Sequence, residues 1–140
     1  VGGTDIRFEN ITSDHSAGAA VYLATESEFN SRTTERVTVS GGTLSSSNAN
    51  SDINHTAVLV YNSREGTTLR VVVIEDLDIV DTRADADADI ALRAKDGGRI
   101  SDVQLRRITA RGGPNLVITA SDGASYTATD ITKNGDEWRG

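Results

Sequence analysis

The chain has 140 residues and no cysteine, so by length it is one domain, with neither a disulfide framework nor a thiolate metal site. Its net charge of −7 disfavours binding to nucleic acid and to anionic membranes through like-charge repulsion. No apolar run approaches the roughly 18 residues that span a membrane, and no signal peptide is visible.

Asp and Arg dominate the charged residues. Asp supplies 14 of the 21 acidic residues, and 12 of the 14 basic residues are Arg. This Asp-rich, Lys-poor composition resembles that of proteins from extreme halophiles, in which carboxylates keep the surface hydrated in concentrated salt. An ordinary acidic extracellular domain is the alternative. The chain begins at Val1 and contains no Met, so we expect it to be a processed or partial piece of a longer protein.

The first predicted strand begins at Ile6. Ile6 and Phe8 alternate with Arg7 and Glu9, which is the pattern of a half-buried strand. The next apolar residue, Ile11, comes three positions after Phe8 instead of two. The backbone must therefore turn a corner between Phe8 and Ile11 if both side chains are to face the core.

This unit of strand, corner and strand occurs five times along the chain. The copies begin at Ile6, Val37, Val72, Val103 and Tyr126. The corner position is occupied in turn by Asn10, Gly41, Asp76, Arg107 and Asp130. Asn, Gly and Asp tolerate the left-handed backbone of a tight bend, which leaves Arg107 as the exception. Self-similarity at intervals of roughly 20–50 residues is typical of stacked repeats.

A shorter strand follows each of the first four copies after a connection of variable length. These strands are predicted at residues 20–23, 57–60, 89–92 and 115–118. Constant strands joined by variable connections indicate that the strands stack and the loops protrude. The expected inward columns are Val21, Val58, Ile90 and Leu116, and Leu23, Val60, Leu92 and Ile118.

The pattern resembles the right-handed parallel β-helix family, the fold of pectate lyases, polygalacturonases and tailspikes. In that family the tight corner is commonly lined by Asn, which Asn10 matches, and the helical return of leucine-rich repeats is missing here. The resemblance implies an all-β fold: a right-handed parallel β-helix, or solenoid, of about four to five coils. Residues 1–140 are expected to form this single domain.

Enzymes of this family hold their catalytic carboxylates on the outward face of the strand that follows the long loop. The corresponding row here is apolar, and it comprises Tyr22, Leu59, Ala91 and Val117. The paired Asp and Gly-His-Gly motifs of the polygalacturonases are also missing, so we expect no catalytic residue and no cofactor. An apolar row is better explained as an interface, covered either by the protruding loops or by a partner subunit.

Two further patterns concern cations and glycans. Asp85, Asp87 and Asp89 alternate with Ala, which places three carboxylates on one side of an extended strand. They are candidate calcium ligands, although a hydrated acidic surface explains the same pattern. Asn10 and Asn54 fit the N-glycosylation motif. Asn54 lies in a long polar loop and is the better acceptor, whereas Asn10 is expected to be a corner residue.

The two ends of the predicted solenoid differ, since Trp138 is placed to fold across the final coil as a partial cap. The N-terminal edge looks uncapped, so we expect further coils of the same protein or another subunit against Ile6 and Phe8.

Two functions remain open from the sequence. The first is a non-catalytic structural, adhesive or assembly module on an extracellular, cell or virion surface, with self-association as its expected interaction. The second is the C-terminal part of a polysaccharide lyase or glycoside hydrolase that acts on acidic glycans. In that case the catalytic coils would precede Val1. Neither hypothesis includes nucleic acid or a membrane as partner.

Overall fold

The computed structural model describes residues 3–29, 32–47, 56–81, 88–112 and 118–139. Every regular element among these residues is a β-strand, so the predicted all-β fold is confirmed. The strands are β1 (Thr4–Asp14), β2 (Val21–Thr25), β3 (Thr34–Ser45), β4 (Thr56–Asn62), β5 (Thr68–Val80), β6 (Ala88–Ala94), β7 (Arg99–Arg111), β8 (Ile118–Ala120), β9 (Ala124–Lys133) and β10 (Asp136–Glu137).

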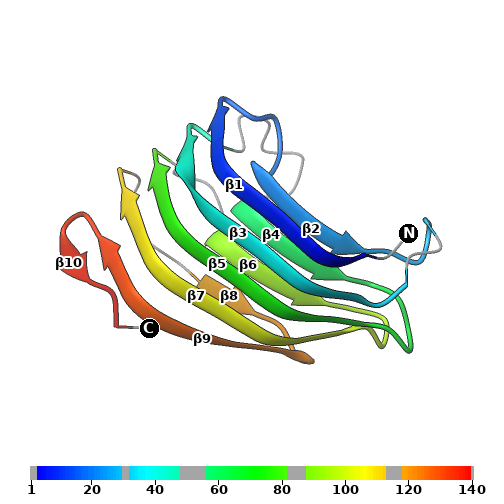
Figure 1. Cartoon of the computed structure of the whole chain (residues 1–140). Helices are drawn as coiled ribbons and strands as arrows, with labels where there is room; N and C mark the ends of the chain where they lie inside the picture. The colour runs from blue at the N-terminus through cyan, green and yellow to red at the C-terminus, as the bar shows by residue number, and fades with distance from the viewer. Residues whose placement is uncertain (1–2, 30–31, 48–55, 82–87, 113–117, 140) are drawn as a thin grey trace.

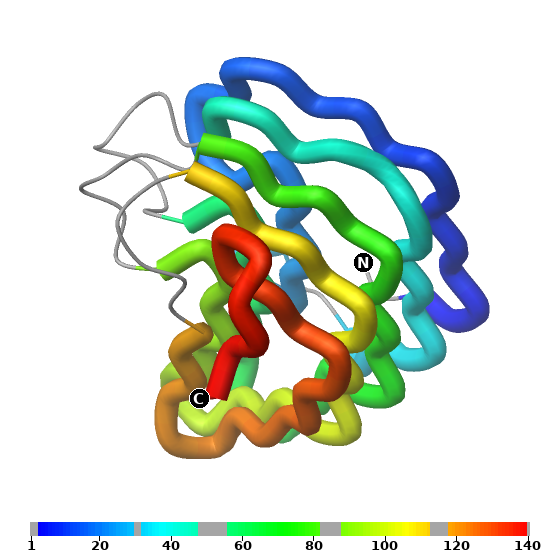
Figure 2. Tube along the Cα trace, turned by 90° about the vertical axis from the view of Figure 1, so that its left-hand side faces the viewer, coloured from blue at the N-terminus to red at the C-terminus, as the bar shows by residue number. Residues whose placement is uncertain are grey.

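The strands form two sheets that stack into a parallel β-solenoid (Figure 1). Long strands make the first sheet, in the order β1-β3-β5-β7-β9-β10, and short strands make the second, in the order β2-β4-β6-β8. Neighbours pair in parallel except β9 and β10, which are antiparallel. Seen from the C-terminal end in Figure 2, the chain winds counter-clockwise as it approaches the viewer. This is the right-handed sense that parallel connections favour.

The solenoid has about three turns, fewer than the four to five coils expected. Five long strands bound only four intervals, and the last interval, from Val103 to Tyr126, is short. In that coil Ile100 pairs with Ala124 and Val103 pairs with Tyr126, so β9 is one residue shorter than β7 at the bend.

The register of the long strands follows the sequence repeat. Ile6 pairs with Val37, which pairs with Val72, and the ladder continues through Val103 to Tyr126. In the short sheet the prediction for the last strand was wrong, because Ile90 pairs with Ile118 and Leu92 pairs with Ala120. A slip of two residues leaves every side chain on the same face, so the apolar pattern alone did not fix it.

The core lies between the two sheets and is made almost entirely of aliphatic side chains. The long strands contribute the fully or nearly fully buried Val37, Val39, Val72, Ile74, Val103 and Leu105. Across the core the short strands contribute Val58, Val60, Ile90 and Leu92. Each such side chain stabilises the fold by roughly 1.5–3 kcal/mol, so these columns are its main source of stability.

A buried asparagine fixes the turn between β4 and β5. The side-chain amide of Asn62 donates hydrogen bonds to the carbonyl oxygens of Thr67, at 3.2 Å, and Arg99, at 2.8 Å. Its Oδ1 accepts from the backbone N–H of Arg64, at 3.0 Å, and from the Thr67 hydroxyl, at 3.2 Å. One side chain thus satisfies the backbone of its own turn and ties it to the next coil.

Each long strand bends at residues with a left-handed backbone. The predicted corner at Asn10 is confirmed by its φ of 53°, and φ is also positive at Gly41, Asp76, Arg107 and Asp130. A second bend, which the sequence did not reveal, lies near the start of four long strands, with φ between 54° and 57° at Asp5, Arg36, Val71 and Asp102. A further left-handed residue follows the end of several long strands, at His15, Ser46, Asp81 and Gly112. The solenoid cross-section is therefore shaped by columns of left-handed residues.

Val71 is the residue least suited to its corner. It is β-branched, has a φ of 56° and is 41% exposed, so its side chain gains little from burial there. The left-handed conformation costs an L-residue roughly 1–2 kcal/mol, and Asn adopts it more readily. We expect Val71→Asn to raise the free energy of unfolding by about 1 kcal/mol in urea titrations. Val73→Asn, two positions on and outside the corner, is the control, and an equal gain at both positions would contradict this explanation.

Candidate functional site

Only part of the outward row of the short sheet is exposed to solvent. Tyr22 pairs with Leu59 and Leu59 with Ala91, as the sequence predicted, but Thr119 instead of Val117 pairs with Ala91. Val117 lies outside the described residues. Tyr22 is 44% exposed, whereas Leu59 and Ala91 are 2% and 0% exposed. This single chain therefore already covers Leu59 and Ala91, which removes them from contact with a partner subunit.

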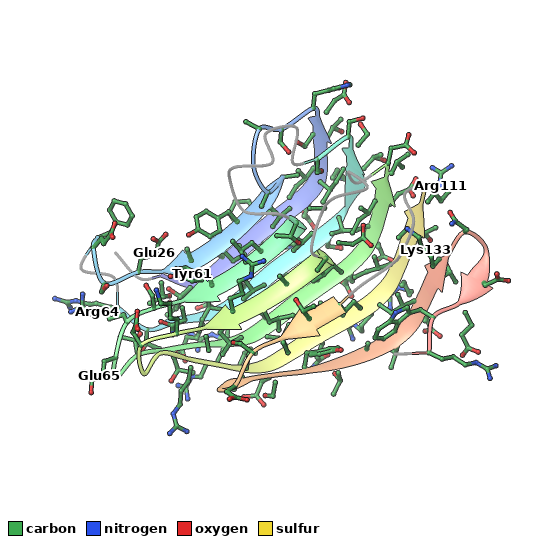
Figure 3. All side chains as sticks on the ribbon, turned by 180° about the vertical axis from the view of Figure 1, so that it is seen from behind. Glu26, Tyr61, Arg64, Glu65, Arg111 and Lys133 are labelled. Atoms are coloured by element: carbon green, nitrogen blue, oxygen red, sulfur yellow. The ribbon has the colours of Figure 1, made fainter. Side chains whose placement is uncertain are left out.

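Two tyrosines lie beside each other on this face, and one of them, Tyr61, is labelled in Figure 3. The ring centroids of Tyr22 and Tyr61 are 6.4 Å apart with an interplanar angle of 36°. The Tyr22 hydroxyl donates a 2.7 Å hydrogen bond to the carboxylate of Glu26. Burial, reinforced by Glu26, raises the pKa of Tyr22 above its ordinary value of 10.0. The phenol therefore stays protonated at neutral pH and acts as a hydrogen-bond donor.

The predicted calcium row is only partly within the described residues. Asp85 and Asp87 lie outside them, whereas Asp89 is described and is 3% exposed. The explanation of the row as a hydrated acidic surface is therefore wrong for Asp89, because residue 89 lies in the covered short sheet. Across the described ranges, no group of three or more His, Asp or Glu side chains could hold a metal ion.

The two N-glycosylation motifs have different outcomes. Asn10 is the left-handed corner residue between Phe8 and Ile11, as expected, and its side chain is exposed. Asn54, the predicted acceptor, lies outside the described residues. His15 also has a left-handed backbone, and its Nδ1 lies 2.8 Å from the Asp14 carboxylate at an exposed position.

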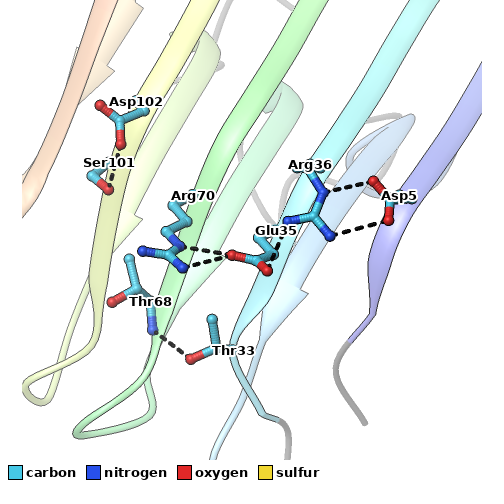
Figure 4. A network of polar contacts seen from close by, with 8 residues as sticks. All are labelled: Asp5, Thr33, Glu35, Arg36, Thr68, Arg70, Ser101 and Asp102. Atoms are coloured by element: carbon cyan, nitrogen blue, oxygen red, sulfur yellow. Dashed lines mark hydrogen bonds and ion pairs between the residues drawn. The ribbon is translucent and has the colours of Figure 1, made fainter.

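Ion pairs link successive coils along the bend near the start of the long strands (Figure 4). The guanidinium of Arg36 binds both carboxylate oxygens of Asp5, at 2.6 and 3.0 Å, and also reaches Glu35, at 2.9 Å. Arg70 in the next coil then binds Glu35 at 2.7 Å. In both links between coils the carboxylate belongs to the earlier coil and the arginine to the following one. This series of ion pairs, the ion-pair ladder, therefore runs from an acidic residue in one coil to an arginine in the next.

The same arrangement explains Arg107, the exception at the predicted corner. Arg107 occupies the corner of β7 and binds both carboxylate oxygens of Asp76, the corner residue of β5, at 2.7 and 3.0 Å. Glu75 accepts from Arg106, at 2.8 Å, and from Arg107, at 2.9 Å. Exposed pairs of this kind contribute little stability each. The sequence signal that would have found them is an acidic residue followed by Arg one repeat interval later.

These ladders make stability depend on acid pH. The hydrogen bonds from Arg36, Arg70 and Arg107 lower the pKa values of Asp5, Glu35 and Asp76 below their ordinary values of 3.8 for Asp and 4.5 for Glu. A carboxyl whose pKa falls on folding stabilises the fold above its unfolded pKa, and this contribution is lost as pH falls through the folded pKa.

We therefore expect the unfolding temperature to fall as the pH drops below about 4.5, and to fall less steeply in Arg107→Gln. Carboxyl titration by NMR checks the assignment directly. Asp76 should titrate below 3.8 in the native chain and shift upward in Arg107→Gln. An Asp76 pKa at or above 3.8 in the native chain would contradict the proposed role of the ladder.

The N-terminal end of the solenoid exposes part of the core. Phe8 is in the same inward column as Val39, Ile74 and Leu105, which are fully buried, yet Phe8 is 45% exposed. Ile6, Ile11 and Leu23 are half-buried beside it. Within the described part of the chain, β1 and β2 each pair on one side only. Flanking Phe8, Arg7 and Glu9 form an exposed ion pair of 2.7 Å.

The C-terminal end is different, because the chain folds back on itself. Asn134 and Gly135, with φ of 50° and 88°, turn the chain into β10, whose Asp136 pairs with Lys133 and Glu137 with Thr132. The backbone N–H of Trp138 then donates to the carbonyl of Ile131 at 2.8 Å, and its ring packs against the core. The expected partial cap by Trp138 is confirmed.

Among the described residues there is no helix long and apolar enough to cross a membrane. No protein-family model, curated protein or solved structure matches the chain. The architecture itself is a parallel β-solenoid with a partial cap at its C-terminal end, and among the described residues β1 and β2 pair on one side only.

Proposed function

We propose that the chain is a non-catalytic structural module that assembles with a partner through its N-terminal end, on an extracellular, cell or virion surface. The observation that carries this proposal is the exposure of Phe8. The large aliphatic members of its inward column are fully buried, whereas Phe8 is 45% exposed. An aromatic side chain in a core position, open to solvent, favours burial against another surface.

The open strand edges support the same proposal. Among the described strands, β1 and β2 each have one edge without a partner, which presents a row of backbone N–H and C=O groups beside the exposed part of the core. Such an edge is a template for a further strand, and main-chain hydrogen bonds to an added strand are a common mode of recognition. An arriving strand would satisfy these groups and cover Ile6 and Phe8 together.

Sedimentation velocity over a wide range of protein concentration tests the assembly. We expect oligomers of the native chain to form with rising concentration, and Phe8→Asp to remain monomeric. Phe29→Asp is the matched control, because Phe29 is 66% exposed and lies outside the inward columns. A native chain that stays monomeric at every concentration would contradict the proposal.

The alternative function is cleavage of acidic polysaccharides as part of a lyase or glycoside hydrolase. The neighbouring Tyr22 and Tyr61 rings could stack on a sugar, as could Tyr126 and Trp138. Incubation with polygalacturonate and alginate separates the two functions. New reducing ends or unsaturated ends would overturn the non-catalytic proposal, whereas unchanged polymer is the expected result.

We also propose, from composition, that the protein works in concentrated salt. The 14 Asp and two Lys residues support this, since a surface rich in carboxylates stays hydrated where water activity is low. The unfolding temperature is expected to rise between dilute and molar KCl. A fall would favour an ordinary acidic protein whose exposed ion pairs are screened by salt.

A further inference from the structure

We propose that the partner at the N-terminal end is a second copy of this chain, related by a two-fold axis that passes between the two Phe8 side chains. In this dimer β1 of each copy pairs antiparallel with β1 of the other, and the two Phe8 side chains pack against each other. The inference rests on the proposed assembly function and names its partner.

The two ends of the solenoid decide between head-to-tail and head-to-head association. β1 and β2 lie at one end of the molecule and β10 at the other (Figure 1). At the C-terminal end β10 and the Trp138 N–H occupy the outer edge of β9 from Ile131 to Lys133. A β1 strand could not add in parallel along the full length of β9 without displacing them. Two N-terminal ends can meet, and two-fold symmetry then makes the β1 strands antiparallel.

The charges on β1 select one register for this pairing. In an antiparallel pair centred on Phe8, Arg7 faces Glu9 of the second copy, and Glu9 faces Arg7 of the second copy. Both charges are well exposed, with side-chain exposures of 62% and 56%. The strand edge is therefore complementary to itself, and opposite charges directly across a pair of strands are stabilising.

Other centres are worse. Centring the pair on Arg7 places Arg7 against itself and Asp5 against Glu9, and centring it on Glu9 places Glu9 against itself. Centring it on Ile6 sets Asp5 against Arg7, but both oxygens of Asp5 are already bound by Arg36.

A centre between two neighbouring residues of the segment 6–9 sets Ile6 or Phe8 opposite an outward residue. A centre between Glu9 and Asn10 sets Phe8 opposite Ile11 but leaves Arg7 and Glu9 without an opposite charge. Of these centres, Phe8 gives attractive pairs between exposed charges on the outer face and contact between the two Phe8 rings on the inner face. The net charge of −7 on each copy opposes this approach, but salt of about 0.15 M screens such repulsion beyond roughly 8 Å.

A single cysteine tests the two-fold axis, because the native chain has none. Cα atoms facing each other in an antiparallel pair lie about 4.5–5.5 Å apart, within disulfide range. We expect Phe8→Cys to form a disulfide-linked dimer on mild oxidation. Val71→Cys, at a residue of similar exposure two long strands away, should not. Equal cross-linking of both variants would overturn the axis.

Charge exchange tests the register in the uncross-linked protein. Arg7→Glu would place a carboxylate against Glu9 of the second copy, and Glu9→Arg would place a guanidinium against Arg7, twice in each dimer. We expect each single variant to raise the dimer dissociation constant about tenfold. The double variant, which restores opposite charges, should return it close to the native value. A double variant as weak as the singles would overturn the register.

The outcomes separate this inference from the function on which it rests. Two results would overturn the two-fold pairing but leave the assembly function standing. One is assembly into filaments that depends on Phe8, and the other is a Phe8→Cys dimer that forms without a disulfide. A native chain that is monomeric at every concentration would overturn both. Circular dichroism of each variant confirms that the β-solenoid has folded before its association is compared.

Discussion

Replacing Gly42 with alanine is expected to lower the free energy of unfolding by about 3–5 kcal/mol. Gly42 occupies an inward column position opposite Ile11, where the other described copies carry Leu77, Ile108 and Ile131. Its φ is 128°. A Cβ at this position would overlap the carbonyl oxygen of Ile11 and lie 2.6 Å from its nitrogen. These are backbone atoms of β1, so no side-chain rotation relieves the clash and β1 must separate from β3.

Gly66→Ala is the matched control for this prediction. Gly66 also has a positive φ, of 72°, but nothing lies within 4 Å of an added Cβ. Its substitution therefore measures backbone strain alone, about 1–2 kcal/mol. Urea unfolding of both variants gives the difference, and hydrogen exchange should show faster exchange in β1 of Gly42→Ala. Equal destabilisation of the two variants would show that the close approach of Ile11 is not responsible.

The β-solenoid was predictable because its core repeats by like residues in like positions. Val37, Val72 and Val103 recur in one column and Val39, Ile74 and Leu105 in the next, and the structure pairs them as the repeat implies. In a parallel stack each apolar position needs an apolar neighbour in the next coil, so the period of the repeat fixes the register. The corner at Asn10 was predictable for a local reason, since Asn is one of the few residues that tolerate φ above zero.

The features that the sequence did not reveal are those set by neighbouring coils. Val71 and Arg36 have no preference for a left-handed backbone, and they adopt it because the stacked strands bend at that level. Arg107 was unexpected at a corner until its pairing with Asp76 in the preceding coil was visible. The register of β8 was missed because a slip by two residues preserves the alternation of faces.

The residues of the predicted interface also fall into two groups. Sequence reasoning placed Ile6 and Phe8 at an uncapped end, and the structure leaves Ile6 half-buried and Phe8 45% exposed there. It also placed Leu59 and Ala91 on an outward apolar row, where the structure buries them within this chain. Alternation shows which side of a strand a residue faces. It does not show what lies over that side.

Ile74→Ala is expected to lower the free energy of unfolding by about 2–5 kcal/mol, independently of protein concentration. Ile74 is fully buried in a central coil, between Val39 and Leu105, and its removal leaves a cavity that stacked strands cannot close. Urea unfolding at two concentrations a decade apart provides the measurement. A cost below about 1 kcal/mol would show that the column repacks, in contradiction to a rigid stacked core.

Phe8→Ala in the same inward column completes the comparison. In an isolated chain its cost should stay below about 2 kcal/mol, because nearly half of the side chain is already exposed to water. Where a second surface covers Phe8, the cost should approach the roughly 3–5 kcal/mol of a buried phenylalanine and should grow with protein concentration. If the cost of Phe8→Ala depends on protein concentration and the cost of Ile74→Ala does not, the assembly surface lies at the exposed end of the column. The same small cost for Phe8→Ala at every concentration would show that this end stays exposed to solvent.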